Sequence, residues 1–195
     1  METNHSVRSG HSSSLRSTAR TAALGMLMVD PIFTGCATQG SYAKVETRDA
    51  RPPAAKDVDA KGENGRTPLM DAVLRGDYGI ARRLIADGAN VNAWDNGGCT
   101  ALMWSAGKET PGEKRTGMTE LLIANGADVN ARDGYGETAL MEAVFWKRSE
   151  TAKVLIAKGA DVNAKREDGM SALGLALKSG DAGIAQMLRE HGARE

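Results

Sequence analysis

The sequence has few of the residues from which catalytic and metal sites are built. Its 195 residues include only three histidines and two cysteines. Two cysteines cannot form a disulfide-dense scaffold, and the spacing of Cys36 and Cys99 fits no zinc motif. The sequence has no phosphate-binding loop, dinucleotide fingerprint, G-x-S-x-G or H-E-x-x-H motif. It therefore predicts no catalysis, no cofactor and no metal.

The chain also lacks an excess of either charge and has few aromatic side chains. Its 25 basic side chains balance its 25 acidic ones, which argues against a nucleic-acid-binding surface. With three Trp, three Tyr and two Phe, the core must consist mainly of Leu, Ile, Val, Ala and Met. That composition suits a thin, one-dimensional stack of helices. Because no catalytic motif is present, no small-molecule substrate is expected.

What the sequence does contain is an internal repeat, clearest between residues 128 and 164. Asp-Val-Asn-Ala at 128–131 returns at 161–164, a period of 33 residues. Three sets of equivalent positions, called columns, recur in this register. The first is Val58, Val91, Val129, Val162; the second is Gly88, Gly126, Gly159, Gly192; the third is Thr67, Thr100, Thr138, Ser171. The second unit carries an insertion between Lys108 and Thr116. A period of this length predicts a solenoid of stacked units.

Each unit contains the start and stop signals of two helices. The Thr or Ser of the third column can act as a helix N-cap, and Pro68 follows at a first helical position, where proline is favoured. The glycine column predicts a left-handed C-cap after the second helix. Asp-Asn-Gly or Asp-Gly sequences then predict a turn before the next cap.

The unit Gly-x-Thr-Pro/Ala-Leu-x-x-Ala, continued by Gly-Ala-Asp-Val-Asn-Ala, resembles the ankyrin repeat from about Asp57 to the C-terminus. The resemblance implies an all-α fold, a solenoid of about four helix-turn-helix units joined by β-hairpin loops. The units would be approximately 57–89, 90–127, 128–160 and 161–195. The family's usual histidine after Thr-Pro-Leu is replaced by Met70, Met103, Met141 and Gly174. Apolar packing must therefore replace the hydrogen bonds of that histidine.

The resemblance also implies a non-enzymatic module that binds a protein partner through its hairpin tips and first helices. The hot spots of protein interfaces are enriched in large aromatic and arginine side chains. In the columns that the repeat leaves variable, the candidate partner-binding residues are Trp94, Trp104, Arg132, Tyr135, Glu142 and Trp146. Alternatively, Trp104 and Trp146 pack sideways onto the next unit. The insertion at 109–115 is either a second contact or a solvated loop.

The N-terminal segment predicts export. Residues 1–36 have the order of a secretory signal, a basic Ser-rich start followed by an apolar run. Thr34-Gly35-Cys36 resembles the bacterial lipobox, which implies acylation of Cys36 and a membrane anchor. Residues 37–56 read as a flexible tether, and 57–195 as the repeat domain. The expected location is the periplasmic face of the bacterial envelope. Cleavage after Ala37 without lipid, or a cytosolic chain with an N-terminal arm, are the alternatives.

Two further motifs have plain structural interpretations. The residues from Asp128 to Gly134 suggest a calcium loop, but Arg132 stands where the fifth loop position needs an oxygen ligand. Cys99 is interpreted as a small, half-buried filler, and a Cys36–Cys99 disulfide competes with that interpretation. Taken together, the sequence predicts an exported protein-binding module. An inhibitor or immunity protein that occludes a toxin or enzyme, and a cytosolic regulator, remain as alternatives.

Overall fold

A computed structural model describes residues 58–107 and 115–194 of the chain. These ranges form eight α-helices and one 3₁₀ helix, and they contain no β-strand. The α-helices are α1 (Pro68–Arg75), α2 (Tyr78–Ala86), α3 (Ala101–Ala106), α4 (Arg115–Ala124), α5 (Ala139–Phe145), α6 (Ser149–Ala157), α7 (Ala172–Lys178) and α8 (Ala182–Glu190); the 3₁₀ helix η3 is Glu63–Gly65. The predicted all-α solenoid is confirmed, with one helix pair in each predicted unit. The predicted signal and tether, with Cys36, and residues 109–114 of the insertion lie outside the described residues.

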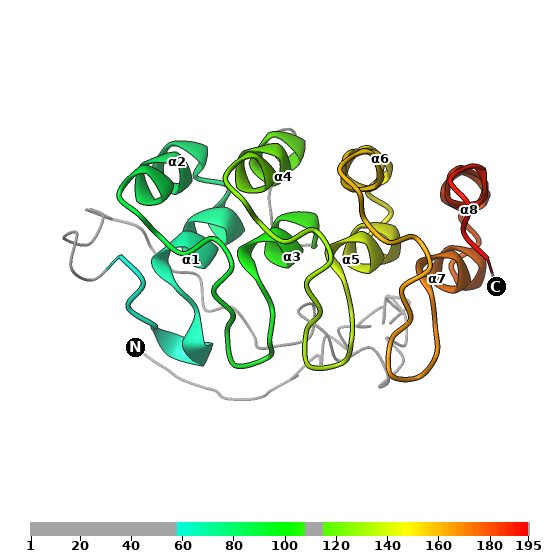
Figure 1. The fold of residues 1–195 in the computed structure, drawn as a ribbon, viewed down its shortest axis with the longest axis horizontal. Coiled ribbons are helices and arrows are strands. Elements are labelled where there is room, and N and C mark those ends of the chain that lie inside the picture. The colour runs from blue at the N-terminus through cyan, green and yellow to red at the C-terminus, as the bar shows by residue number, and fades with distance from the viewer. Residues whose placement is uncertain (1–57, 108–114, 195) are drawn as a thin grey trace, which may run out of the picture. The chain divides into compact units, whose positions relative to one another are not determined.

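The helices stack in two rows with loops projecting from one side (Figure 1). Helices α1, α3, α5 and α7 form the inner row, in which each helix packs against the next. Each of them also packs against the second helix of its own unit. Because every unit contacts mainly its neighbours, the core is a continuous strip along the stack rather than a central cluster.

The predicted N-caps begin all four inner helices. The hydroxyl oxygens of Thr67, Thr100 and Thr138 accept the backbone N–H three residues later at 3.4 Å, and Ser171 accepts that of Gly174 at 3.2 Å. Each bond satisfies one donor that the first helical turn leaves without a partner. The caps therefore fix where each inner helix starts, and thereby where the preceding loop ends.

Methionine takes the inner-helix position where a histidine was expected from the resemblance. Met70, Met103 and Met141 are at most 1% exposed and belong to the hydrophobic core. In the first unit the Met70 sulfur also lies 3.5 Å from the backbone nitrogen of its cap, Thr67. Apolar packing thus fills this column, as the sequence predicted.

The loops between units are called fingers 1 to 4 here, namely residues 58–66, 89–99, 127–137 and 160–170. Antiparallel bridges close the bases of two of them, Trp94 to Thr100 and Lys165 to Ser171. An asparagine ladder joins neighbouring fingers: Asn130 donates to the Gly159 carbonyl at 3.1 Å and accepts the Asp161 N–H at 2.8 Å. Asn92 and Asn163 make the equivalent pairs of bonds. The ladder holds the fingers side by side, so their side chains form one surface.

Within 58–107 and 115–194, no helix is long and apolar enough to cross a bilayer.

Candidate functional site

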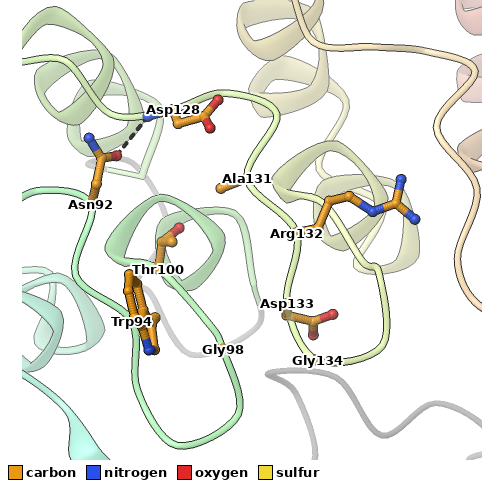
Figure 2. A pocket seen from close by; sticks show the side chains of 9 residues that line it. All are labelled: Asn92, Trp94, Gly98, Thr100, Asp128, Ala131, Arg132, Asp133 and Gly134. Atoms are coloured by element: carbon orange, nitrogen blue, oxygen red, sulfur yellow. Dashed lines mark hydrogen bonds between the residues drawn. The ribbon is translucent and has the colours of Figure 1, made fainter.

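A groove of about 590 Å³ opens between fingers 2 and 3 (Figure 2). This volume lies within the 300–1,000 Å³ range of ligand-binding pockets. The residues that line it are Asn92, Trp94, Gly98, Thr100, Asp128, Ala131, Arg132, Asp133 and Gly134. Every one of them belongs to a finger or to the cap that follows it, so the groove is a feature of the loops rather than of the helices.

Hydrogen bonds close the groove at both ends. At the helix end the Asp128 N–H donates to the Asn92 side-chain oxygen at 2.8 Å (Figure 2). At the distal end the Gly134 N–H donates to the Gly97 carbonyl at 3.0 Å. There the backbones approach so closely that a Cβ on Gly98 would lie 2.8 Å from the Gly134 nitrogen. Fingers 2 and 3 are therefore joined at both ends of the opening.

Trp94 forms one wall of the groove and is the most exposed large apolar side chain among the described residues, at 63%. The Nζ of Lys61, from finger 1, lies 5.7 Å from the centroid of the Trp94 ring. The same Nζ donates to the Trp94 carbonyl oxygen at 2.7 Å. A cation within about 6 Å of an indole face is attracted by the ring quadrupole. Lys61 therefore holds Trp94 in an exposed orientation.

A family model described as ankyrin repeats (3 copies) matches residues 51–133 and 112–195, which together cover most of the chain. The chain belongs to the ankyrin-repeat family. No curated protein matches it. Ankyrin repeats indicate a protein–protein interaction module, so a partner-binding residue has to lie on the exposed surface of the stack.

On the fingers of the ankyrin stack, two more candidates are exposed. Tyr135 is 41% exposed at the end of finger 3. Arg132 is exposed as well, but its guanidinium donates to the Lys165 carbonyl of finger 4 and points away from Trp94 (Figure 2). Arg132 therefore bridges two fingers and presents mainly its backbone to the groove.

The prediction that Trp104 lies on the binding surface is wrong, because the structure buries it. It is 3% exposed in α3, and its Nε1 donates to Asp95 Oδ2 at 3.1 Å. The other oxygen of Asp95 accepts the N–H groups of Gly97 and Cys99. Trp104 thus ties the inner helix of the second ankyrin unit to the turn of its own finger.

Glu142 occupies the equivalent position in α5 and was also misplaced by the sequence analysis, since it is only 1% exposed. Its Oε2 accepts the Trp146 Nε1 at 3.0 Å, while its Oε1 is buried and has no hydrogen-bond partner among the described residues. Trp146 itself is half-buried and packs edge-on against Phe145, with ring centroids 4.8 Å apart. Both tryptophans therefore contact residues of their own units, and the alternative that they pack sideways onto the next unit stays a prediction.

Glu142 is part of a buried acidic cluster beneath finger 3, with Asp133 and Glu137. Burial raises the pKa of Glu142 to about 8, and the charges of Glu137 and Asp133 add to this. Burial likewise raises the pKa of Glu137 to about 6, although a hydrogen bond from Arg166 opposes it. The pKa of the Asp133 carboxyl is raised, again by burial first. The described residues contain no group of three or more His, Cys, Asp or Glu side chains that could hold a metal ion.

Arg166 is the cation that compensates this cluster. Its Nη1 lies 2.6 Å from Glu137 Oε1, and their side chains are 5% and 2% exposed. Its Nη2 contacts Asp168, whose pKa is lowered mainly by that bond. Arg166 takes the position that Asp95 and Asp133 hold in the two earlier fingers. The replacement of aspartate by Arg166 at this repeat position thus supplies the positive charge that pairs with buried Glu137.

Cys99 lies beside the cap of α3 and is fully buried, not half-buried as the sequence suggested. It is held in a disulfide and is not a free thiol. Cys36, the chain's other cysteine, lies outside the described residues. The interpretation of Cys99 as a free, space-filling thiol is therefore wrong, and the pairing of Cys36 with Cys99 stays a prediction.

Sequence reasoning did not place Asp128 and Asp133 in a groove, although both line it; the carboxylate of Asp133 points into its own finger (Figure 2). Both were examined only as part of a calcium loop. The column at the finger tips, from which Trp94 and Arg132 were chosen as candidates, reads Lys61, Trp94, Arg132, Lys165. Trp94 is the one uncharged residue of this column, and the groove opens beside it, between fingers 2 and 3.

Proposed function

We propose that the finger surface around Trp94 and Tyr135 binds a protein partner and that the chain has no enzymatic activity. The observation that carries the proposal is the exposure of two large aromatic side chains on neighbouring fingers, 63% for Trp94 and 41% for Tyr135. Aromatic rings are enriched at interface hot spots because they bury a large area at low entropic cost. The adjoining groove offers a concave seat for a partner's side chain.

The test places a photo-crosslinking phenylalanine analogue at Tyr135 in the full-length chain, expressed in its own cells. The matched control carries the same group at Arg82, which is exposed on the outer helix α2. We expect a discrete crosslinked protein from the Tyr135 position and none from Arg82. Equal crosslinking from both positions, or from neither, would contradict a finger-mediated function.

Truncation then measures the contribution of each ring. Hot-spot aromatics lose about 2 kcal/mol or more on change to alanine, roughly a 30-fold loss of affinity. We expect Trp94→Ala and Tyr135→Ala each to weaken binding of the captured protein by about that factor. Because both side chains are exposed, the urea-unfolding free energy should change by less than about 0.5 kcal/mol. Identification of the captured protein as an enzyme or toxin would assign the inhibitor role.

The location of the stack is a second proposal, export to the bacterial envelope with a lipid on Cys36. What supports it is the basic, then apolar, then Thr-Gly-Cys order of residues 1–36. The disulfide at Cys99 gives the opposing argument, since Cys36 is the only other cysteine and a paired cysteine cannot be acylated. Both fates of Cys36 fit an oxidising compartment.

Non-reducing mass spectrometry of the mature chain distinguishes the two fates. The lipid proposal predicts a new N-terminus at Cys36 with the added mass of acyl chains, and release of the Cys36→Ala variant from the membrane fraction. A Cys36–Cys99 cross-linked peptide would replace the lipid proposal by soluble export. An uncleaved N-terminus would contradict export altogether.

A further inference from the structure

A hydrogen bond ties the inner helix of the second unit to its finger. The Trp104 Nε1 on α3 donates to Asp95 Oδ2 at 3.1 Å. Asp95 Oδ1 accepts two backbone N–H groups of finger 2, at 2.9 and 3.0 Å. Both oxygens of this buried aspartate therefore have donors, and one of those donors comes from the helix.

In the third unit the same two positions hold two carboxyl groups. Asp133 takes the position of Asp95, and Glu142 takes that of the tryptophan. Asp133 again points into its own finger (Figure 2), where its Oδ1 accepts two backbone N–H groups at 2.9 and 2.8 Å. Asp133 Oδ2 and Glu142 Oε1 are buried and have no hydrogen-bond partner among the described residues. The donor that the indole provides in the second unit is therefore missing from the third.

The buried charges around finger 3 do not balance. Three carboxyl groups are buried there, those of Asp133, Glu137 and Glu142. Arg166 is the only buried cationic side chain of the described residues, and it already bonds Glu137 and Asp168. Glu142 has no cation within ion-pair distance in the part of the chain that the structure describes. Because an unpaired carboxylate is far more costly to bury than the neutral acid, Glu142 keeps its proton, and burial raises its pKa to about 8.

The groups that act on Glu142 belong to finger 3. Helix α5 packs against α3, α6 and α7. Helix α3 has no titratable side chain. The titratable side chains of the other two helices are all exposed and are Lys178 on α7, and Glu150 and Lys153 on α6. The charges that raise the pKa of Glu142 further are those of Glu137 and Asp133, so its proton is coupled to the finger rather than to the neighbouring helices.

We propose that protonated Glu142 forms the contact that holds finger 3 on α5, and that loss of its proton releases the finger. The carboxyl O–H takes the part of the indole N–H in the second unit. It donates directly or through one buried water to finger 3, where Asp133 Oδ2 and Glu137 Oε2 both lack a donor among the described residues. Deprotonation leaves three carboxylates together, and the finger moves away from the helix with Tyr135 at its end. This rests on the proposed function, because Tyr135 belongs to the binding surface, and it adds control by pH.

Hydrogen exchange of the unbound, full-length chain tests this contact. The reporters are two finger 3 amides bonded to the turn aspartate, Tyr135 and Glu137, and the internal control is the equivalent pair of finger 2, Gly97 and Cys99. Between pH 6.5 and 9 we expect the protection factors of the finger 3 pair to fall about 10- to 30-fold, because the released carboxyl ionises at its ordinary pKa. Those of finger 2 should change little, since an indole does not titrate in this range. A parallel loss in both fingers, or no loss in finger 3, would overturn the proposal.

Glu142→Gln should make finger 3 insensitive to pH. Glutamine can accept the Trp146 N–H and donate its own amide N–H to the finger at any pH, so the protection factors should stay level from pH 6.5 to 9. Glu150→Gln, at an exposed position of α6, is the matched control and should keep the wild-type dependence. A Glu142→Gln variant whose finger 3 loosens as in the wild type would contradict the role of this carboxyl.

Crosslinking from Tyr135 to the captured protein, repeated at pH 6.5 and 9, connects the contact to binding. We expect a lower yield at pH 9 with the wild-type background and the same yield at both pH values with Glu142→Gln, which corrects for titration of the partner. Equal pH dependence in the two backgrounds would overturn the control by pH and leave the proposed function intact. A finger 3 that loosens with pH but crosslinks nothing at either pH would remove the proposed function and leave the Glu142 contact.

Discussion

Replacing Glu142 by glutamine should make the protein more stable at pH 9 and leave it little changed at pH 4.5. Glu142 is 1% exposed, and its pKa in the folded chain is about 8 against an ordinary value of 4.5. The folded state therefore keeps a proton that the unfolded chain releases as the pH rises. Glutamine has nearly the same shape and can still accept the Trp146 N–H, but it has no charge to bury.

The direction follows from proton linkage. A carboxyl with a raised folded pKa gives its full stability below pH 4.5, loses it progressively as the pH rises to about 8, and gives none above that value. The difference between these pKa values corresponds to roughly 5 kcal/mol at most. We expect the glutamine variant to exceed the wild type by at least about 2 kcal/mol at pH 9, because water penetration reduces the full effect.

Urea unfolding at pH 4.5, 7 and 9 measures this effect. Glu150→Gln is the matched control, because that side chain is 71% exposed on α6 and pairs only with Lys153. Glu142→Leu is a second variant, since the next unit has Leu175 at the same position, 6% exposed. If wild type and Glu142→Gln lose stability in parallel between pH 4.5 and 9, then Glu142 does not hold its proton in the folded chain.

The second large effect is expected from Arg166→Met, which should destabilise the protein by about 3–5 kcal/mol. Arg166 lies 2.6 Å from Glu137, and both side chains are almost fully buried. Removing the guanidinium leaves the Glu137 carboxylate buried, beside Asp133, without the cation that pairs with it among the described residues. Uncompensated buried charge, rather than the lost pair itself, accounts for most of this cost.

A double variant tests that explanation. In the fourth unit the position equivalent to Glu137 is Met170, so Glu137→Met introduces a residue that the repeat already accepts. Replacing a buried ion pair by apolar residues is often neutral. Arg166→Met with Glu137→Met should therefore recover most of the loss in urea unfolding at pH 7. The Lys153→Met change, at an exposed pair, should cost less than about 1 kcal/mol. A double variant no more stable than Arg166→Met alone would show that packing, not charge, is at fault.

The repeat frame could be predicted from the sequence because its signals are local. Thr138 caps its helix with its own hydroxyl, and Gly159 has φ +92, the left-handed conformation that a glycine allows without strain. Such features depend on a few neighbouring residues. The columns therefore located the start of every inner helix, and the spacing of 33 residues alone indicated that the units stack.

Burial across the stack could not be predicted in this way. Trp104 and Glu142 follow a core methionine in a column that also holds Asp71, so their residue types suggested an exposed position. In the folded chain the finger of the same unit reaches back toward this column, as the bond from Trp104 to Asp95 shows. A column position states which face a residue is on, but the finger that folds back over that face decides how deeply the residue is buried.

The sequence by itself determined the family, the number of units, the caps and the loop positions, because each is encoded within one repeat of 33 residues. Only the tertiary structure decided which candidates reach solvent, that Arg166 compensates Glu137, and that the fingers part beside Trp94. The last two features arise between units, from residues 29 or more positions apart, such as Arg166 and Glu137 or Lys61 and Trp94. Contacts between repeats depend on which variable residues meet, and a periodic pattern does not specify that.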